Sequence, residues 1–229
     1  MARTLVAVFV ALMILMGAPD AGAHFSMLTP SDNIVTIKDD KEITLRAWFI
    51  DPHERMVLTM NKPKALGVRV RGSEIDLLAS LEKLDMPDGT AYELLYRIKK
   101  PGDHIFHMTT APYWDSMDGI FIIQDTKVVV NALGHSGGWE EPLGQTVEIV
   151  PLTRPYGLWV GNVFQGRVLY NGKPMAGVEV EVEYFNPLDE ARRLSAPSTP
   201  YVTQSVLTDS DGVFTYAIPR QGWWGFAVT

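Results

Sequence analysis

The sequence contains no cysteine, which removes several kinds of protein from consideration. Disulfides, thiolate metal sites and cysteine nucleophiles are all excluded. Positive charge is also scarce, because 20 Lys and Arg residues stand against 27 Asp and Glu residues, and the net charge is −7. The Lys and Arg residues form no long run. An acidic chain without a basic patch is poorly suited to nucleic acids and anionic lipids, so neither is expected as a partner.

Long hydrophobic runs are missing too, with one exception at the start of the chain. Residues 5–16 are uncharged and apolar, but a membrane span needs about 20 such residues. Arg3 precedes this run, and the stretch APDAGA at 18–23 ends on the A-x-A pattern that signal peptidase accepts. We therefore expect residues 1–23 to be a signal peptide that is removed on export to the periplasm. The mature chain would then begin with His24.

Helical periodicity is scarce in the mature chain, whereas short β signals are abundant. Segments rich in β-branched and aromatic residues are separated by Gly, Pro, Asp and Asn. They are NIVTIKD, EITLRAWFI, ALGVRVRG, AYELLYRIKK, HIFHMTT, FIIQDTKVVVNAL and QTVEIVPL. The segment 73–86 is the only helical candidate, and a strand–turn–strand fits it nearly as well. Many short strands at this spacing predict an all-β fold, with an Ig-like β-sandwich over residues 24–154.

A second β module is expected after the connector PLTRPYGLWVGNVF, in which two prolines and two glycines interrupt the strand pattern. The stretches GRVLYNGKPMAGVEVEVEYF and TQSVLTDSDGVFTYAIP each indicate strand, turn and strand. This layout resembles the transthyretin-like or carboxypeptidase-regulatory-like modules of exported proteins, and we assign it to residues 155–229. The sequence stops within an apolar, strand-like stretch, GWWGFAVT. The natural protein is therefore expected to continue beyond Thr229.

The first candidate metal ligand is the expected N-terminus itself. After cleavage, His24 has a free α-amine and an imidazole, which can chelate one ion through two nitrogens. Further ligands must come from elsewhere in the chain. Asp51 and His53 follow the apolar strand LRAWFI, where a rigid sheet holds side chains and a loop admits an ion. The competing interpretation of His53 is an ordinary exposed loop histidine.

The pair His104 and His107 also suggests a metal site, but the spacing disfavours one. Side chains alternate along a regular strand, so residues three apart face opposite sides of the sheet. The phrase PGDHIF resembles the Pro-Gly-x-Tyr-x-Phe corner of Ig-like strands, with His104 at the position of the Tyr. In that corner the aromatic residue packs inward, together with the residue that corresponds to Phe106. We therefore expect His104 to be structural and His107 to be available as a ligand.

One motif suggests an enzyme, and its context argues against that. Residues 134–138, GHSGG, match the G-x-S-x-G of α/β-hydrolases, but Pro142 and Gly144 disfavour the helix that must follow, and no histidine comes after His135. The motif also resembles the GDSGG of serine proteases, with His in place of Asp. We interpret it as a glycine-rich loop and expect no enzymatic activity.

Several long phrases are similar to a known family. They are AHF at the mature start, NKPKALGV, APYWDSMDGIFI, TKVVVNALG, EIVPLTRPYGLWVGNVFQGRVLYNGKPMAGVEVEVEYFN and GVFTYAIPRQGWWGFA. The chain resembles exported DUF4198-type proteins that serve as an additional periplasmic component of energy-coupling-factor nickel transporters. The resemblance covers nearly all of residues 24–229. It implies a periplasmic nickel-binding protein that acts beside the membrane components of a nickel or cobalt transporter.

The ligand pattern departs from that family, and only His24 stands where the resemblance places a ligand. The family phrase His-Pro-Phe-Glu corresponds to DPHE at residues 51–54, and Ile-His-Tyr-Thr-Lys corresponds to a segment with Gln124 in place of His. A shift of two residues keeps the side on which an extended segment presents a side chain, so His53 can replace one ligand. His107 is a candidate for the other. The expected metal ligands are His24, Asp51, His53 and His107.

Two alternatives stand beside a nickel protein. Imidazoles with an amine also suit Cu(II) and Zn(II), and the order of affinities favours copper, so nickel follows from the resemblance alone. The first alternative is a copper protein or oxidase-like enzyme with an N-terminal histidine brace. The second is a β protein at the cell surface that holds no metal.

Overall fold

The computed structural model describes residues 25–115, 119–186 and 193–228. Over these residues the chain forms β-strands and short 3-10 turns, so the prediction of an all-β sandwich fold is confirmed. The two 3-10 turns are η1 (Leu78–Ser80) and η3 (Thr199–Tyr201). No helix in this part of the chain is long and apolar enough to cross a membrane.

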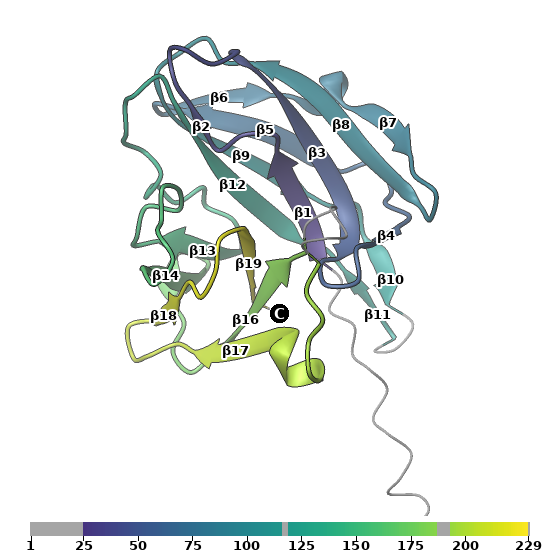
Figure 1. The fold of residues 1–229 in the computed structure, drawn as a ribbon, viewed down its shortest axis with the longest axis vertical. Helices are drawn as coiled ribbons and strands as arrows, with labels where there is room; N and C mark the ends of the chain where they lie inside the picture. Colours follow the sequence, from purple (N-terminus) through teal and green to yellow (C-terminus); the bar gives the residue numbers. More distant parts are fainter. Residues whose placement is uncertain (1–24, 116–118, 187–192, 229) are drawn as a thin grey trace, which may run out of the picture.

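The N-terminal part of the molecule is a pair of sheets packed face to face (Figure 1). The first sheet, which we call sheet A, consists of β1 (Phe25–Pro30), β3 (Glu42–Asp51), β8 (Thr90–Arg97) and β7 (Glu82–Asp85), with β4 (Met56–Leu58) also beside β3. The second sheet, which we call sheet B, consists of β2 (Ile34–Val35), β12 (Asp125–Ala132), β9 (Gly102–Thr109), β5 (Ala65–Val70) and β6 (Ser73–Asp76). All pairs are antiparallel except β2 with β12.

The core of this pair follows from alternation along each strand. In β3, Ile43, Leu45 and Ala47 are buried and point toward sheet B. From sheet B, residues such as Val68 and Phe106 fill the same core. Each side chain of this kind contributes about 1.5–3 kcal/mol when it is fully buried. Because the chain has no cysteine to form a disulfide, this core has to stabilise the packing of sheet A on sheet B.

His104 lies in this core, as the sequence predicted. It is 1% exposed, its Nδ1 accepts a hydrogen bond from the Tyr96 hydroxyl at 3.2 Å, and its Nε2–H donates to the carbonyl oxygen of Lys100 at 3.0 Å. Burial lowers the pKa of His104, so the neutral ring is favoured. The segment 73–86, for which the sequence left a helix and a strand–turn–strand open, forms β6, η1 and β7, so it is the strand–turn–strand.

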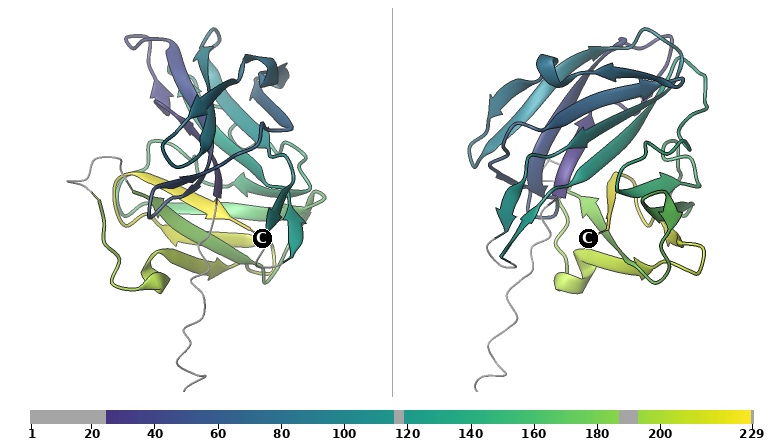
Figure 2. Two further views of the ribbon diagram at one scale, coloured as in Figure 1. Left: turned by 90° about the vertical axis from the view of Figure 1, so that its right-hand side faces the viewer. Right: turned by 180° about the vertical axis from the view of Figure 1, so that it is seen from behind.

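The C-terminal part is a second, smaller pair of sheets below the first (Figure 2). Sheet C consists of β13 (Val147–Pro151), β14 (Val163–Tyr170), β15 (Lys173–Pro174) and β18 (Val213–Ala217). Sheet D consists of β17 (Thr203–Leu207), β16 (Glu179–Phe185) and β19 (Trp223–Ala227). Their shared core contains Phe164 and Phe214 from one sheet and Val180 from the other.

The position of β13 differs from the sequence-based boundary after residue 154. Residues 147–151 were expected in the first β domain, but β13 pairs with β14 of the second pair of sheets. The strand pattern of QTVEIVPL predicts a strand without specifying its partner, and the connector that was expected to separate the two β units begins at Pro151, the last residue of β13. The chain therefore leaves the first pair of sheets after β12.

A buried polar cluster joins the connector to the first pair of sheets. Asp103, 1% exposed, accepts hydrogen bonds at Oδ1 from the Tyr156 hydroxyl at 2.7 Å and from Asn131 Nδ2 at 2.8 Å. Its Oδ2 accepts from the N–H of Gly137 at 2.6 Å. The GHSGG stretch is thus part of a loop that closes over a buried carboxylate, and no helix follows it.

Candidate metal site at the start of the first strand

The start of β1 lies beside the end of β3. Phe25 pairs with Ile50 in antiparallel register, so Asp51 is the next residue of β3 beyond that pair. His24 lies outside the described residues, but one peptide bond joins it to Phe25, and consecutive Cα atoms are about 3.8 Å apart. A mature chain that begins with His24 would start one residue before this pair.

Gln124 reaches the same end of β1 from the other sheet. Its Oε1 accepts a hydrogen bond from the N–H of Ser26 at 2.7 Å, and its Nε2 donates to the Tyr113 hydroxyl at 3.2 Å. Next to it, the hydroxyls of Ser26 and Thr126 are 2.6 Å apart. The two positions that the resemblance singled out, 51 and 124, thus flank the start of β1. The amide oxygen of Gln124 is already engaged by the main chain.

Asp51 and His53 lie in the turn that joins β3 to β4. Asp51 Oδ1 accepts hydrogen bonds from the N–H groups of His53 at 2.9 Å and Glu54 at 2.8 Å, which fixes the turn. The side chain of His53 is only 14% exposed. Its Nδ1 is 3.5 Å from Asn186 Nδ2, and its Nε2 is 3.8 Å from Glu54 Oε1. His53 is therefore held against the second pair of sheets and is not an exposed loop histidine.

His107 lies on the other face of sheet B. Its neighbours Phe106 and Met108 are in the core, and Thr126, which pairs with Met108, points toward Ser26 of β1. Alternation places the His107 side chain on the opposite face. The structure thus brings Asp51 and His53 to the start of β1 and does not bring His107 there. Sequence alternation separated His104 from His107, but it could not show which face of sheet B meets β1.

The surroundings of His107 are those of a surface ion pair. Its Nε2–H donates to Glu74 Oε1 at 2.5 Å, and Glu74 Oε2 is 3.2 Å from Arg69 Nε. A Cβ atom added to Gly67 would come within 2.9 Å of His107 Nε2, so glycine at this position makes room for the ring. We therefore interpret the contact between Glu74 and His107 as structural and not as part of a metal site.

A buried carboxyl group that the sequence did not single out lies near Asp51. Glu183 of β16 is 2% exposed. The Thr203 hydroxyl donates to its Oε1, while its Oε2 has no hydrogen-bond partner among the described residues. Burial raises the pKa of Glu183 to about 7, and the negative charges of Asp51 and Glu181 act in the same direction. The alternation in VEVEVEYF predicts a solvated face for its glutamates, so the burial of Glu183 could not be inferred from this segment.

The described residues contain no group of three or more His, Asp and Glu side chains close enough to hold a metal ion. A metal site at the start of β1 therefore depends on the two nitrogens of His24. Of the other expected ligands, the carboxylate of Asp51 and the imidazole of His53 lie at this end of the sheet, and such donors suit nickel, copper or zinc.

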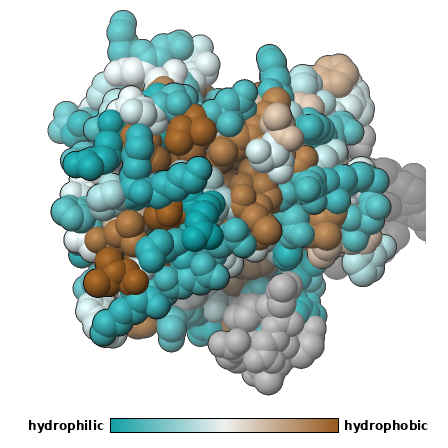
Figure 3. All heavy atoms as spheres, turned by 90° about the horizontal axis from the view of Figure 1, so that it is seen from above, coloured by the Kyte–Doolittle hydropathy of each residue, from teal (hydrophilic) through white to brown (hydrophobic). Residues whose placement is uncertain are grey.

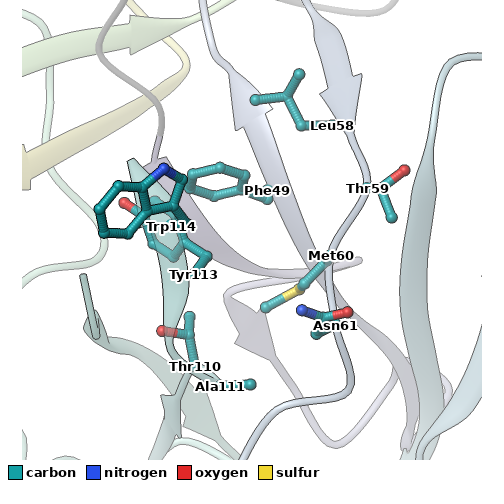
Figure 4. Close-up of a pocket in the computed structure, with 9 residues that line it drawn as sticks. All are labelled: Phe49, Leu58, Thr59, Met60, Asn61, Thr110, Ala111, Tyr113 and Trp114. Carbon is teal, nitrogen blue, oxygen red and sulfur yellow. The ribbon is translucent and has the colours of Figure 1, made fainter. Parts of the chain in front are cut away.

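A small cavity of about 200 Å³ opens beside this end of the sandwich (Figure 4). Phe49, Met60, Thr110, Tyr113 and Trp114 are among its lining residues. The rings of Phe49 and Tyr113 are 4.7 Å apart between centroids. Tyr113 also binds Gln124, so the cavity adjoins the candidate metal site.

Two of the residues that line the cavity, Tyr113 and Trp114, belong to β10 (Tyr113–Asp115), which pairs with β11 (Ile120–Ile122). Trp114 and Phe121 of this hairpin pack edge to face with centroids 5.1 Å apart, and they are 56% and 70% exposed. Seen from above, the surface is largely hydrophilic, with apolar side chains in small groups between polar ones (Figure 3).

Comparison with known proteins gives a family without a known role. Residues 21–229 match the family model described as "Domain of unknown function (DUF4198)". No curated protein sequence is significantly similar to the chain.

Three similar solved structures are proteins or domains of low sequence identity. The adhesin InvE of Yersinia pseudotuberculosis is 10% identical, with 88% of this chain and 54% of that chain covered and a TM-score of 0.28. The D00-D0 domain of intimin is 14% identical, with 82% of this chain and 84% of that chain covered and a TM-score of 0.20. BcpA, the major pilin subunit of Bacillus cereus, is 11% identical, with 90% of this chain and 59% of that chain covered and a TM-score of 0.19. The chain spans about half the length of InvE. At these TM-scores the likenesses carry no argument about function.

Proposed function

The chain belongs to the DUF4198 family, and we propose that it is an exported, periplasmic metal-binding protein that delivers nickel to a membrane transporter. The observation that carries this proposal is the position of β1. Its first described residue pairs with Ile50 at the end of β3, and Ser26 is bonded to Gln124 of the other sheet. A chain cleaved after Ala23 would begin at the place where these two sheets meet.

The chemistry of the cleaved terminus supports the same proposal. The α-amine of His24 has an ordinary pKa of about 7.7–8.0, so a metal ion can displace its proton near neutral pH. The amine and the imidazole then form one chelate ring with the ion. Asp51 supplies a carboxylate close by, and His53 supplies an imidazole in the same turn. His107 is left out of this site because it lies on the far face of sheet B.

Nickel as the preferred ion rests on the family resemblance, since the affinity order alone favours Cu(II). Delivery to the membrane components of a nickel or cobalt transporter rests on the same resemblance. Both can be tested separately from metal binding itself.

Native mass spectrometry of the exported protein, purified from a periplasm with added nickel chloride, tests the proposal. We expect a mass that starts at His24 with one nickel ion bound, and loss of that ion in His24→Ala. His107→Ala is the matched control and should keep the ion. A different N-terminus, or the same nickel occupancy in His24→Ala, would contradict the proposal.

A copper protein with a histidine brace is the second candidate, because it uses the same amine and imidazole of His24 and Cu(II) heads the affinity order. The adjoining cavity with Tyr113 and Trp114 could admit a small substrate. Reductant-dependent production of peroxide by the copper-loaded protein would favour this candidate over nickel delivery. If neither metal binds, a metal-free surface β protein is the alternative.

A further inference from the structure

The cavity beside β10 is lined by segments that continue both sheets of the first pair. Residues 58–61 run on from the end of β4 in sheet A, and the lining residues between 110 and 114 follow β9 of sheet B. Trp114, one of them, is 56% exposed, so solvent reaches the cavity. Its volume of about 200 Å³ is below the range of about 300–1,000 Å³ that is usual for drug-sized ligands, so it suits a single ring.

One side of the cavity is aromatic. In Figure 4, the rings of Phe49, Tyr113 and Trp114 lie together, and the centroids of the first two are 4.7 Å apart. Phe121 of the neighbouring strand packs edge to face on Trp114, with centroids 5.1 Å apart, and so supports its ring. These rings offer an apolar surface to a ligand that has an apolar face of its own.

Two residues of the lining carry hydroxyl groups that are left as hydrogen-bond donors. The N–H of Gln124 donates to Thr110 Oγ1 at 2.9 Å, and Gln124 Nε2 donates to the Tyr113 hydroxyl oxygen at 3.2 Å. The direction of the second bond is fixed, because Gln124 Oε1 accepts from the N–H of Ser26 and Nε2 therefore faces Tyr113. Neither hydroxyl donates to an acceptor among the described residues, so each O–H is available to a ligand oxygen.

The rest of the lining is neutral. Asn61 is exposed, and its side-chain amide, which can both donate and accept, makes no hydrogen bond within the described part of the chain. None of the described residues that line the cavity is charged. A phosphate, a carboxylate or a cation would lose hydration there without gaining an opposite charge. A wholly apolar ligand would cover the two hydroxyls without giving them acceptors. The lining therefore favours a neutral ligand with an apolar face and several oxygen atoms.

We propose that this cavity binds a neutral sugar, with one pyranose ring packed on Trp114 and its oxygens accepting hydrogen bonds from Thr110 and Tyr113. The C–H groups on one face of a pyranose ring are apolar, and its hydroxyl and ring oxygens are hydrogen-bond acceptors, so one small molecule meets both requirements. The amide of Asn61 bonds a further hydroxyl. The site uses none of the expected metal ligands, so this inference goes beyond the proposed function and does not depend on it.

The test is calorimetric titration of the metal-free exported protein with glucose, galactose, mannose and N-acetylglucosamine. We expect wild type to bind at least one of these sugars, and Trp114→Ala to weaken that binding by more than about tenfold. Tyr113→Phe keeps the ring and removes only the donor, so it should weaken binding roughly threefold to tenfold, the effect of one neutral hydrogen bond. Trp159→Ala is the matched control, because Trp159 is 81% exposed and lies in the connector, and it should bind as wild type does.

Three results would overturn the inference. The first is that folded wild type binds none of the four sugars. The second is that phenol, a flat ring with one hydroxyl, binds more tightly than every sugar, because the cavity would then be a site for apolar rings. The third is sugar binding that is unchanged in Trp114→Ala or in Tyr113→Phe, which would place the sugar elsewhere. Thermal unfolding checks that each variant folds. Nickel binding through His24 is a separate result that decides only the proposed function.

Discussion

The N–H of Asn186 donates a hydrogen bond to the carbonyl oxygen of Pro52 at 3.0 Å, and so fastens the end of β16 to the turn after β3. The side chain of Asn186, which is 0% exposed, extends this contact. Its Nδ2 donates to the carbonyl oxygen of His53, and its Oδ1 accepts from the N–H of Leu194 at 3.0 Å. One buried amide thus satisfies main-chain groups of both pairs of sheets.

Replacing Asn186 by Ala should therefore destabilise the protein. The change leaves the carbonyl oxygen of His53 and the N–H of Leu194 without this partner, and each unsatisfied buried group costs about 1–3 kcal/mol. We expect a loss of about 2–4 kcal/mol in the free energy of unfolding, measured by urea denaturation. A loss below about 0.5 kcal/mol would show that water replaces the amide at no cost.

The Asp103 cluster predicts a second effect on stability. Tyr156→Phe removes a hydroxyl that donates to the buried carboxylate, and losing a hydrogen bond to a charged group costs about 1.5–3 kcal/mol. Tyr170→Phe is the matched control, because Tyr170 is 50% exposed and its replacement should change stability by less than about 0.5 kcal/mol. Both values are read from urea denaturation at pH 7. Equal effects of the two variants would contradict the role given to the cluster.

The pH dependence of stability without metal tests the burial of Glu183. Its pKa is raised from 4.5 to about 7 by burial, so the folded state binds the proton more tightly than the unfolded state does. Stability from this group is fully present below pH 4.5 and is lost as the pH rises through 7. We expect a loss of about 3 kcal/mol for wild type and a smaller one for Glu183→Gln.

His104 provides an opposite trend in the same experiment. Burial lowers the pKa of His104 below 6.5, so its contribution is present above 6.5 and is lost as the pH falls through the folded pKa. The two trends overlap, and only the difference between wild type and Glu183→Gln isolates the carboxyl group. Identical pH profiles for the two proteins would contradict a protonated Glu183.

The ion pair of His107 and Glu74 predicts a small effect. The side chains are 22% and 45% exposed, and such pairs contribute about 0–1 kcal/mol. His107→Ala should therefore change the free energy of unfolding by about 1 kcal/mol or less and leave the nickel affinity within twofold. A large loss of nickel affinity, measured by calorimetric titration, would show that His107 is a metal ligand.

The sequence predicted those features that depend on local patterns. Alternation and turn residues predicted the all-β fold and the buried His104, whereas for residues 73–86 they left a helix and a strand–turn–strand both open. Features that depend on which strands meet could not be read in this way. The pairing of β13 with β14, the face of His107 and the burial of Glu183 are all set by contacts between distant segments.

Glu183 illustrates the limit most clearly. In VEVEVEYF, a glutamate at every second position predicts a face turned to water. Instead, sheet A covers this face, and Phe185 packs against Trp48 there. Nothing within the segment itself indicates that another sheet will lie on it. For the candidate metal site, the sequence supplied His24, Asp51, His53 and His107, and the fold places Asp51 and His53, but not His107, at the end of sheet A where β1 begins.

The most direct test of the account compares nickel binding by two forms of the mature chain. One is the exported protein that begins with His24, and the other carries a single additional Ala before His24, which moves the α-amine away from the imidazole. Calorimetric titration should show one nickel ion bound by the first form and at least 100-fold weaker binding by the second. Equal affinities, or no binding by the first form, would contradict a metal site built on the N-terminal histidine.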